Sequence, residues 1–239
     1  MALNFVNKNQ ILYITLDNLK YGNSFGIEEA NRLRDGLDTY SGHSLKGIIF
    51  GSSSRRFFCA GGNLSHYSKQ QSREEGIADN QVIAKVLDQL SQWPGPTICV
   101  VQGDCLGGGM ELLSTFDHVL ATPHSYFGFW QRRIGLTWGW KGGGRWLSRI
   151  PMSTLRSLSL EARSFSAYEA LRLGLIDGIE GEHSIYQAAE AWVMQQSSWP
   201  QEPIAAIKDF DSKSEQGRFQ DLWWNPSHKK ALQKFKDKN

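Results

Sequence analysis

Long apolar runs, paired cysteines and a surplus of one charge are all missing from this sequence of 239 residues. No apolar stretch approaches the ~20 residues that a membrane-spanning helix needs, so we expect no integral membrane protein. The three cysteines, Cys59, Cys99 and Cys105, are odd in number and form no C-x-x-C pair. This pattern argues against a disulfide framework and a structural zinc site, and it predicts reduced, mostly buried thiols.

Neither the net charge nor the first residues of the chain indicate a charged partner or a targeting signal. The 26 Lys and Arg residues and the 24 Asp and Glu residues give a net charge of +2, so nothing demands nucleic acid or an anionic membrane. The first ten residues contain no basic segment followed by an apolar stretch, so we expect no secretory signal and a cytoplasmic location. With 40% apolar and 21% charged residues, we expect one large folded domain, or one domain with an appendage.

Short apolar runs alternate with helical patterns through the first half of the chain, which is typical of an α/β domain. Apolar residues recur every three or four positions over residues 27–40 and 77–93, and they predict two helices with one buried face each. A third helix is expected to begin in the triplet at residues 107–109 and to run through Phe116. Strands are predicted at residues 3–6, 11–16, 46–50, 97–102 and 117–121, the first two as a hairpin.

The second half of the chain is predicted to be mainly helical. Ser166 and Glu169 match the Ser-x-x-Glu capping box, so a helix is expected to begin there and to end near Gly174. Beyond Glu182, apolar side chains are spread among Lys, Gln and Asp, which indicates amphipathic helices that must dock on another surface. A neighbouring subunit would provide such a surface.

Two segments place glycines after a predicted strand, at the kind of sheet edge where α/β folds usually bind ligands. The first is Phe-Phe-Cys-Ala-Gly-Gly-Asn-Leu at residues 57–64, and the second is Gly-Asp-Cys-Leu-Gly-Gly-Gly-Met-Glu-Leu at residues 103–112. Neither has the spacing of a phosphate loop or of a dinucleotide-binding fingerprint, so nucleotide binding loses its main support. Glycine lets a ligand approach bare backbone, with N–H groups free to point at an oxygen atom.

Together these segments resemble the crotonase, or enoyl-CoA hydratase/isomerase, superfamily. The resemblance extends from the first hairpin to about Gly178, and residues 162–177, Ala-Arg-Ser-Phe-Ser-Ala-Tyr-Glu-Ala-Leu-Arg-Leu-Gly-Leu-Ile-Asp, are similar to another segment of that family. It implies a crotonase-like spiral of ββα units over residues 1–182 and a C-terminal helical trimerisation region over residues 183–239. It also implies an acyl-CoA substrate, no cofactor beyond the coenzyme A moiety, and a homotrimer or dimer of trimers.

The resemblance also assigns a role to each glycine segment. The backbone N–H groups of Gly62 and Gly108 would form an oxyanion hole, which stabilises the negative charge that develops on the thioester carbonyl oxygen. Gly108 is expected at a helix N-terminus, where unpaired amides and the helix dipole favour an anion. Residues of the first segment would contact the coenzyme A moiety, namely Ala60, Gly62, Asn63 and Leu64.

Hydratases of this family use two glutamates to hold water and move protons, and only one of them is present here. Glu111 lies three residues after Gly108, on the same helix face, so the resemblance makes it the acid/base. The second family position falls on Gln131, whose amide orients water but does not exchange a proton at neutral pH. This departure weighs against two-carboxylate hydration and leaves double-bond migration open.

Decarboxylation of a malonyl-type thioester, such as a methylmalonyl- or ethylmalonyl-like CoA ester, gives the same enolate. A glutamate facing the leaving carboxylate would repel it, whereas neutral Gln131 beside Arg132 or Arg133 would not. The loop Trp-Gly-Trp-Lys-Gly-Gly-Gly-Arg at residues 138–145 is weakly similar to a loop of decarboxylating relatives. Four tryptophans around this loop suit either an acyl pocket or a subunit interface: Trp130, Trp138, Trp140 and Trp146.

Three functions are therefore carried forward. Hydration or isomerisation of an enoyl-CoA comes first, because it is the family's commonest task. Decarboxylation of a malonyl-type CoA ester comes second, and a non-catalytic acyl-CoA-binding trimer comes third. Residues 225–238, with five lysines and one aspartate, would attract coenzyme A phosphates or form a solvated helix face. His66 and His118 have no partner at metal-ligand spacing, so we predict no metal site.

Overall fold

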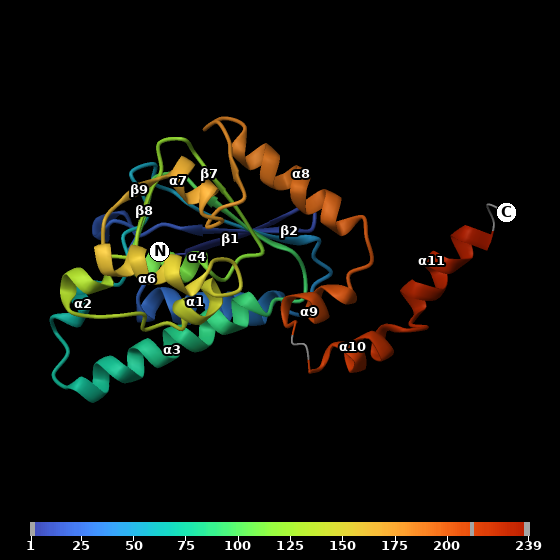
Figure 1. The fold of residues 1–239 in the computed structure, drawn as a ribbon, viewed down its shortest axis with the longest axis horizontal. Helices are drawn as coiled ribbons and strands as arrows, with labels where there is room; N and C mark the ends of the chain where they lie inside the picture. Colours follow the sequence, from blue (N-terminus) through green and yellow to red (C-terminus); the bar gives the residue numbers. More distant parts are fainter. Residues whose placement is uncertain (1–2, 211–212, 237–239) are drawn as a thin grey trace.

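The computed structural model describes residues 3–210 and 213–236, which form two sheets and the helices around them (Figure 1). The strands are β1 (Leu3–Lys8), β2 (Ile11–Leu16), β3 (Gly47–Ser52), β4 (Phe57–Cys59), β5 (Thr97–Val101), β6 (Asp104–Leu106), β7 (His118–Ala121), β8 (Tyr126–Gly128), β9 (Phe165–Ser166) and β10 (Gly178–Ile179). The helices are η1 (Leu19–Tyr21), α1 (Ile27–Tyr40), α2 (Leu64–Tyr67), α3 (Arg73–Ser91), α4 (Gly108–Leu113), η2 (Gln131–Ile134), α5 (Gly142–Trp146), α6 (Met152–Glu161), α7 (Ala167–Arg172), α8 (Ile185–Ser197), α9 (Pro203–Lys208), α10 (Glu215–Leu222) and α11 (Pro226–Lys236).

The chain passes repeatedly from a large sheet to a small one. The large sheet has the order β1-β2-β3-β5-β7-β10 and the small sheet has the order β4-β6-β8-β9. Each of β3, β5 and β7 is followed directly by a strand of the small sheet, β4, β6 and β8 respectively, and then by helical segments. This succession is the ββα spiral that the sequence predicts, and the α/β fold class is confirmed.

Most of the predicted elements are present. The hairpin forms as β1 and β2, which pair antiparallel, and the later strand predictions correspond to β3, β5 and β7. Helix α1 has the predicted bounds, whereas α3 begins four residues early because the Ser72 hydroxyl caps it by accepting a hydrogen bond from the Glu75 N–H. The prediction that α4 runs through Phe116 was wrong. It ends at Leu113, and the Ser114 and Thr115 hydroxyls bond its last carbonyls.

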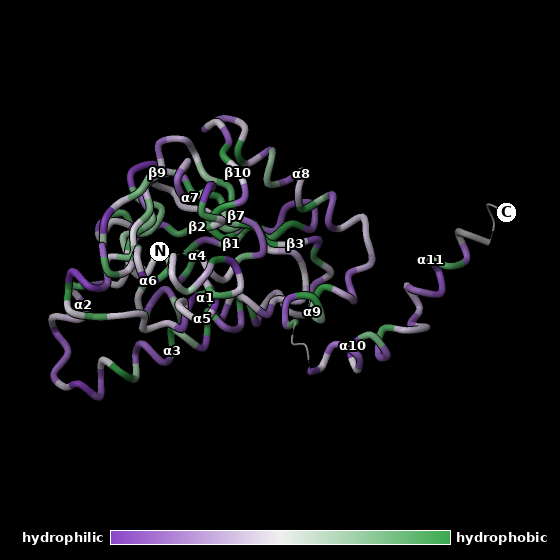
Figure 2. The backbone as a smooth tube through the Cα atoms, in the orientation of Figure 1, coloured by the Kyte–Doolittle hydropathy of each residue, from purple (hydrophilic) through white to green (hydrophobic). Residues whose placement is uncertain are grey.

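The core lies on both faces of the large sheet. Helices α1 and α3 cover one face, and α8 covers the other with Ile185, Ala189 and Val193 (Figure 1). Figure 2 shows the apolar stretches concentrated in the strands, while the helices alternate between polar and apolar residues. The predicted boundary between a ββα core at residues 1–182 and a helical region at residues 183–239 stays a prediction. Helix α8 lies after this boundary, but its buried side chains pack in the core of the large sheet.

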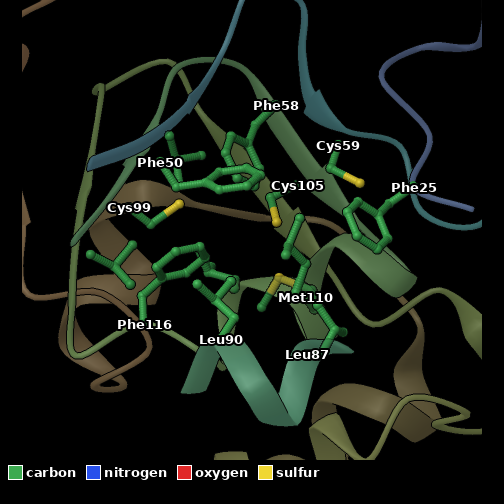
Figure 3. Close-up of a cluster of buried hydrophobic side chains, with 14 of the residues drawn as sticks. Phe25, Phe50, Phe58, Cys59, Leu87, Leu90, Cys99, Cys105, Met110 and Phe116 are labelled. Atoms are coloured by element: carbon green, nitrogen blue, oxygen red, sulfur yellow. The ribbon is translucent and has the colours of Figure 1, made fainter. Parts of the chain in front are cut away.

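Aromatic rings and all three thiols meet in the core between the two sheets (Figure 3). The centroid of the Phe50 ring lies 5.3 Å from that of Phe116. Cys99 and Cys105 lie near these rings, whereas Cys59 lies next to Phe25 (Figure 3). Cys59, Cys99 and Cys105 are buried and unpaired, as predicted. Burial raises the pKa of the Cys59 thiol to about 12, so this group is a protonated core residue at neutral pH.

The last helices leave the body of the fold. Helix α9 is held by Lys208, whose ammonium group lies 2.8 Å from the Asp117 carboxylate and donates to the carbonyls of Trp93 and Gly95 at 2.8 and 2.7 Å. Beyond it, α10 and α11 extend away from the sheets (Figure 1). None of the helices described is both long and apolar enough to cross a bilayer.

Candidate functional site

The candidate site lies where three parallel strands of the small sheet end. Strands β4, β6 and β8 are neighbours and run parallel, so their carboxyl ends meet at one edge. Residues 60–62 follow β4, residues 107–108 follow β6, and residues 129–131 follow β8. The topology therefore brings together both glycine segments and Gln131. These strands have three residues each, too few for the alternation that predicts a strand, so sequence analysis missed them.

The two glycine turns touch each other. Gly61 has a φ of +104°, and a Cβ atom there would lie 3.0 Å from the Leu106 carbonyl oxygen and 3.1 Å from the Gly108 nitrogen. Only glycine fits this position without strain. The Gly61 carbonyl accepts a hydrogen bond from the Phe25 N–H at 2.9 Å, and the Gly107 N–H donates to the Gly128 carbonyl at 2.8 Å. Hydrogen bonds to neighbouring segments therefore hold both glycine turns in place.

The backbone N–H groups of Gly62 and Gly108 are the two that the resemblance assigns to an oxyanion hole, and their contact with a ligand stays a prediction. Each glycine is partly exposed, and within the described residues no hydrogen bond takes up the N–H of either one. Gly108 is the first residue of α4, as predicted, so its N–H lies at the start of the helix where no intrahelical acceptor exists. The close contact of Gly61 with the Gly108 nitrogen shows that the two segments share one small region.

Two aromatic rings stand over these glycines. A Cβ atom at Gly62 would lie 2.9 Å from Tyr67 Cε2 and 3.0 Å from the Tyr67 hydroxyl oxygen. A Cβ atom at Gly108 would lie 2.4 Å from two carbons of the Trp140 ring. Any side chain at either glycine would displace the ring above it, so both glycines are needed for close packing.

The two rings are joined by one amide side chain. Asn80 Oδ1 accepts a hydrogen bond from the Tyr67 hydroxyl at 3.1 Å and from Trp140 Nε1 at 2.7 Å. The ring of Phe25 packs edge-on against Trp140, with 6.0 Å between centroids. We call these three side chains, Tyr67, Asn80 and Trp140, the arch. They come from α2, α3 and the loop before α5, and the two rings lie over Gly62 and Gly108.

Glu111 is buried and its carboxylate is fully occupied. One oxygen accepts from the Gln131 amide at 3.3 Å and from the Gly139 N–H at 3.1 Å, and the other accepts from the Trp140 and Gly142 N–H groups at 2.8 and 3.0 Å. A carboxylate offers about four lone-pair sites, and all four are used. Glu111 therefore holds the loop that carries Trp140.

Opposing effects act on the proton affinity of Glu111. Burial raises the pKa of its carboxyl group, and the hydrogen bonds from Trp140, Gly142, Gly139 and Gln131 lower it by smaller amounts. The pKa is raised on balance. A proton on this carboxyl group would nevertheless have to displace one of the four donors, because each oxygen already accepts two hydrogen bonds.

Gln131 faces Glu111, whereas the neighbouring arginines do not. Its amide nitrogen donates to Glu111, and its Oε1 is buried without a partner among the described residues. Arg132 donates to the Leu160 carbonyl and Arg133 to the Ala162 carbonyl at 2.7 Å, both at the end of α6. Arg132 also helps to line the same cavity as Gln131, so the expectation that an arginine stands beside Gln131 at the substrate stays a prediction.

The residues expected to contact coenzyme A occupy three different settings. Ala60 is partly buried and donates its N–H to the Gly22 carbonyl at 3.1 Å. Asn63 caps α2, since its Oδ1 accepts a hydrogen bond from the His66 N–H at 3.0 Å. The Leu64 side chain is exposed at the protein surface. Their contact with a ligand stays a prediction.

One cavity adjoins the arch, and a second cavity shares residues 136–138 with it. Tyr67, Asn80 and Trp138 help to line a cavity of about 480 Å³. Gln131 and Trp138 help to line a second cavity of about 350 Å³. Trp140 and Trp146 are buried in the core, so of the four clustered tryptophans it is Trp138 that lines both cavities.

The remaining predicted polar groups have ordinary partners. His66 pairs with Asp79 at 2.8 Å, and His118 lies 3.7 Å from Asp177 and stacks on Trp192. The residues described contain no group of three or more His, Cys, Asp or Glu side chains that is suited to a metal ion. Of the basic run at 225–238, the last two residues lie outside the described part of the chain.

Sequence analysis missed Tyr67 and Asn80. Tyr67 is thirteen positions from Asn80 and Asn80 is sixty positions from Trp140, so no local motif connects them. The one available signal was that Tyr67 closely follows the Ala-Gly-Gly-Asn segment, on a short helix that begins directly after it.

Comparisons with known proteins show which family this chain resembles. The family model for enoyl-CoA hydratase/isomerase matches residues 6–233. Ethylmalonyl-CoA decarboxylase of Gallus gallus is 27% identical over 92% of this chain and 78% of its own length. Mitochondrial methylglutaconyl-CoA hydratase of Homo sapiens is 30% identical over 79% of this chain and 56% of its own length.

A solved structure supports the fold. The enoyl-CoA hydratase of Mycobacterium smegmatis superposes with a TM-score of 0.89, covering 100% of this chain and 97% of its own, at 18% identity. Because the family model covers nearly the whole sequence and the ββα spiral is present, the chain belongs to the enoyl-CoA hydratase/isomerase family of the crotonase superfamily.

Proposed function

We propose that this protein releases CO₂ from a malonyl-type CoA thioester and stabilises the resulting enolate between the N–H groups of Gly62 and Gly108. We choose decarboxylation among the family's reactions because of the hydrogen bonds that Glu111 makes. Its carboxylate accepts four hydrogen bonds and holds the loop at residues 139–142, so it is poorly placed to move protons.

The proposed step needs no base. The bond between the α-carbon and the carboxylate breaks, its electron pair forms the enolate, and the negative charge moves to the thioester oxygen. Two preorganised N–H donors stabilise that charge, and each is typically worth ~10²–10³ in rate. The rings of Tyr67 and Trp140 pack over the two glycines, and they would offer the leaving carboxylate an apolar setting that favours neutral CO₂ over the charged group.

Hydration makes stronger demands on the same residues. Water must be held and deprotonated, and the α-carbon must be protonated, a task for which the family's hydratases use two carboxylates. Gln131 does not titrate, and Glu111 would have to give up one of the backbone donors of its loop. The geometry thus favours decarboxylation over hydration, which reverses the order that sequence analysis gives.

The relatives support the same choice. Proteins named ethylmalonyl-CoA decarboxylase, from birds, amphibians and rodents, resemble this chain at 24–29% identity. Hydration remains the second candidate because methylglutaconyl-CoA hydratases match at 30% identity over 192 and 167 residues. The acyl chain would occupy the cavity that Tyr67 and Asn80 help to line.

The substrate class is tested by incubating the purified protein separately with ethylmalonyl-, methylmalonyl-, 3-methylglutaconyl- and crotonyl-CoA. We expect CO₂ release from the malonyl-type esters and no loss of the enoyl absorbance from the other two. Hydration of an enoyl ester without CO₂ release would contradict the proposal. If no ester reacts but one stays bound through gel filtration, the chain is an acyl-CoA-binding module instead.

A homotrimer or dimer of trimers is proposed on the same family basis. Apolar side chains on and near α9–α11 are 53–70% exposed, which is what an interface would cover: Trp199, Ile207, Phe210, Phe219, Trp223 and Trp224. Sedimentation at three or six times the 27.0 kDa chain mass is expected, and sedimentation as a monomer would contradict it.

A further inference from the structure

We propose that Tyr67 is the acid that protonates the enolate carbon after CO₂ has left. This inference rests on the proposed decarboxylation and adds a residue that the sequence motifs do not mark. Decarboxylation needs no base, but it does need a proton: the α-carbon receives an electron pair and must be protonated before the product is released.

The position of Tyr67 follows from the way α2 begins. Asn63 caps this helix directly after the glycine segment, and the Tyr67 N–H donates to the Asn63 carbonyl at 3.0 Å. One helical turn thus folds the phenol back over Gly62, where its oxygen would be 3.0 Å from a Cβ atom. The hydroxyl therefore lies beside the amide that we assign to the thioester oxygen.

The hydroxyl is also held in place. It donates to Asn80 Oδ1 at 3.1 Å, and Asn80 is itself fixed because its Nδ2 donates to the Gly76 carbonyl at 2.7 Å. Trp140 Nε1 donates to the same Asn80 oxygen at 2.7 Å. The ring is therefore held in one place, and rotation of the hydroxyl away from Asn80 would direct its proton to one face of a planar enolate, whereas bulk water reaches whichever face is open.

The protonation state suits an acid. Burial, and to a smaller extent the nearby Glu111 and Asp79 carboxylates, raises the pKa of Tyr67 to about 12. The phenol is therefore protonated at neutral pH. A thioester enolate is a much stronger base than a phenolate, so transfer from Tyr67 to the carbon is downhill.

The transfer balances without any further reactant. The O–H bond of Tyr67 breaks, the proton joins the α-carbon, and the enolate electron pair restores the thioester carbonyl. The phenolate that remains interacts with Trp140, which favours the ionised form, and it regains a proton from solvent. Glu111 is a less suitable donor because its four hydrogen bonds are all accepted ones.

The test follows deuterium from D₂O into the product of ethylmalonyl-CoA. The wild-type protein is expected to give one enantiomer of [2-²H]butyryl-CoA. Tyr67→Phe keeps the ring over Gly62 but has no proton, so we expect a mixture of enantiomers and, where protonation limits turnover, a rate about 10² lower. Tyr168→Phe is the matched control, because Tyr168 is exposed on α7 and far along the chain from the site.

Asn80→Ala separates proton donation from positioning. It removes the acceptor of the Tyr67 hydroxyl but leaves the phenol over Gly62, so it should slow turnover while keeping one enantiomer in excess. A mixture of enantiomers from Tyr67→Phe supports the inference, whatever the turnover rate of this variant. A single enantiomer from folded Tyr67→Phe overturns it, even if the rate falls. If the wild-type protein releases no CO₂ at all, the proposed function fails first, and the inference fails with it.

Discussion

Replacing Gly108 with proline is expected to lower the rate of CO₂ release by ~10²–10³, because it deletes one of the two donors to the thioester oxygen. Gly108 is the first residue of α4, a position that proline tolerates well, so the helix itself should persist. The donor acts mainly on the charged transition state. The loss should therefore appear in kcat, with a smaller change in KM.

Gly108→Ala is the control that this experiment requires. Any Cβ atom at this position meets the Trp140 ring at 2.4 Å, so both variants displace the ring, but alanine keeps the N–H. The ratio of the two rates isolates the donor from the packing defect. Equal rates for folded Gly108→Ala and Gly108→Pro would remove this amide from the mechanism.

Truncating Glu111 to alanine is expected to lower the free energy of unfolding by about 3 kcal/mol or more, at about 1–3 kcal/mol for each buried donor left without an acceptor. Three backbone N–H groups lose their acceptor, those of Gly139, Trp140 and Gly142. The loop that positions Trp140 over Gly108 would loosen. Urea denaturation monitored by tryptophan fluorescence measures the loss.

Glu111→Gln should be much milder. Its oxygen can serve the Trp140 and Gly142 donors, and its new amide can donate to Gln131 Oε1, which has no partner in the described chain. The Gly139 N–H would lose its acceptor, and the Gln131 amide would have to turn so that its Oε1 takes the place of its Nε2, so we expect about 1–2 kcal/mol. Glu28→Gln, on the exposed start of α1, is the control and should change stability by less than about 0.5 kcal/mol.

The same glutamine variant also separates the two reactions. Carbon–carbon bond breaking needs no base, so Glu111→Gln should keep CO₂ release if Glu111 only holds the loop. If Glu111 is the acid/base that the resemblance predicts, enoyl-CoA hydration or isomerisation in the wild-type protein would be abolished in this variant. Loss of CO₂ release in a stable Glu111→Gln protein would contradict the positioning role.

The glycine segments were predictable from sequence because their chemistry is local. Gly61 needs a positive φ and a close approach to Gly108, and only glycine meets both demands without strain. The long helices were predictable because an apolar stripe recurs along each of them. Strands β4, β6 and β8 were not, because each has three residues and is defined by its neighbours.

The role of Glu111 could not be predicted from the sequence motif that contains it. Sequence places it one turn into α4, which is correct, but its function depends on the irregular path of residues 135–141 around it. Four donors reach it from positions twenty to thirty-one residues away. The arch could not be predicted from a motif for the same reason, because its three side chains come from separate elements.

The most direct test of the oxyanion site is the carbonyl stretch of a bound thioester, measured by isotope-edited infrared spectroscopy with [1-¹³C]butyryl-CoA. Two N–H donors aimed at one oxygen polarise the C=O bond, so the band should move to lower frequency on binding to the wild-type protein. Gly108→Pro should lose much of that displacement, and Gly108→Ala should retain it. A bound ester whose band stays at its solution frequency in the wild-type protein would contradict the account.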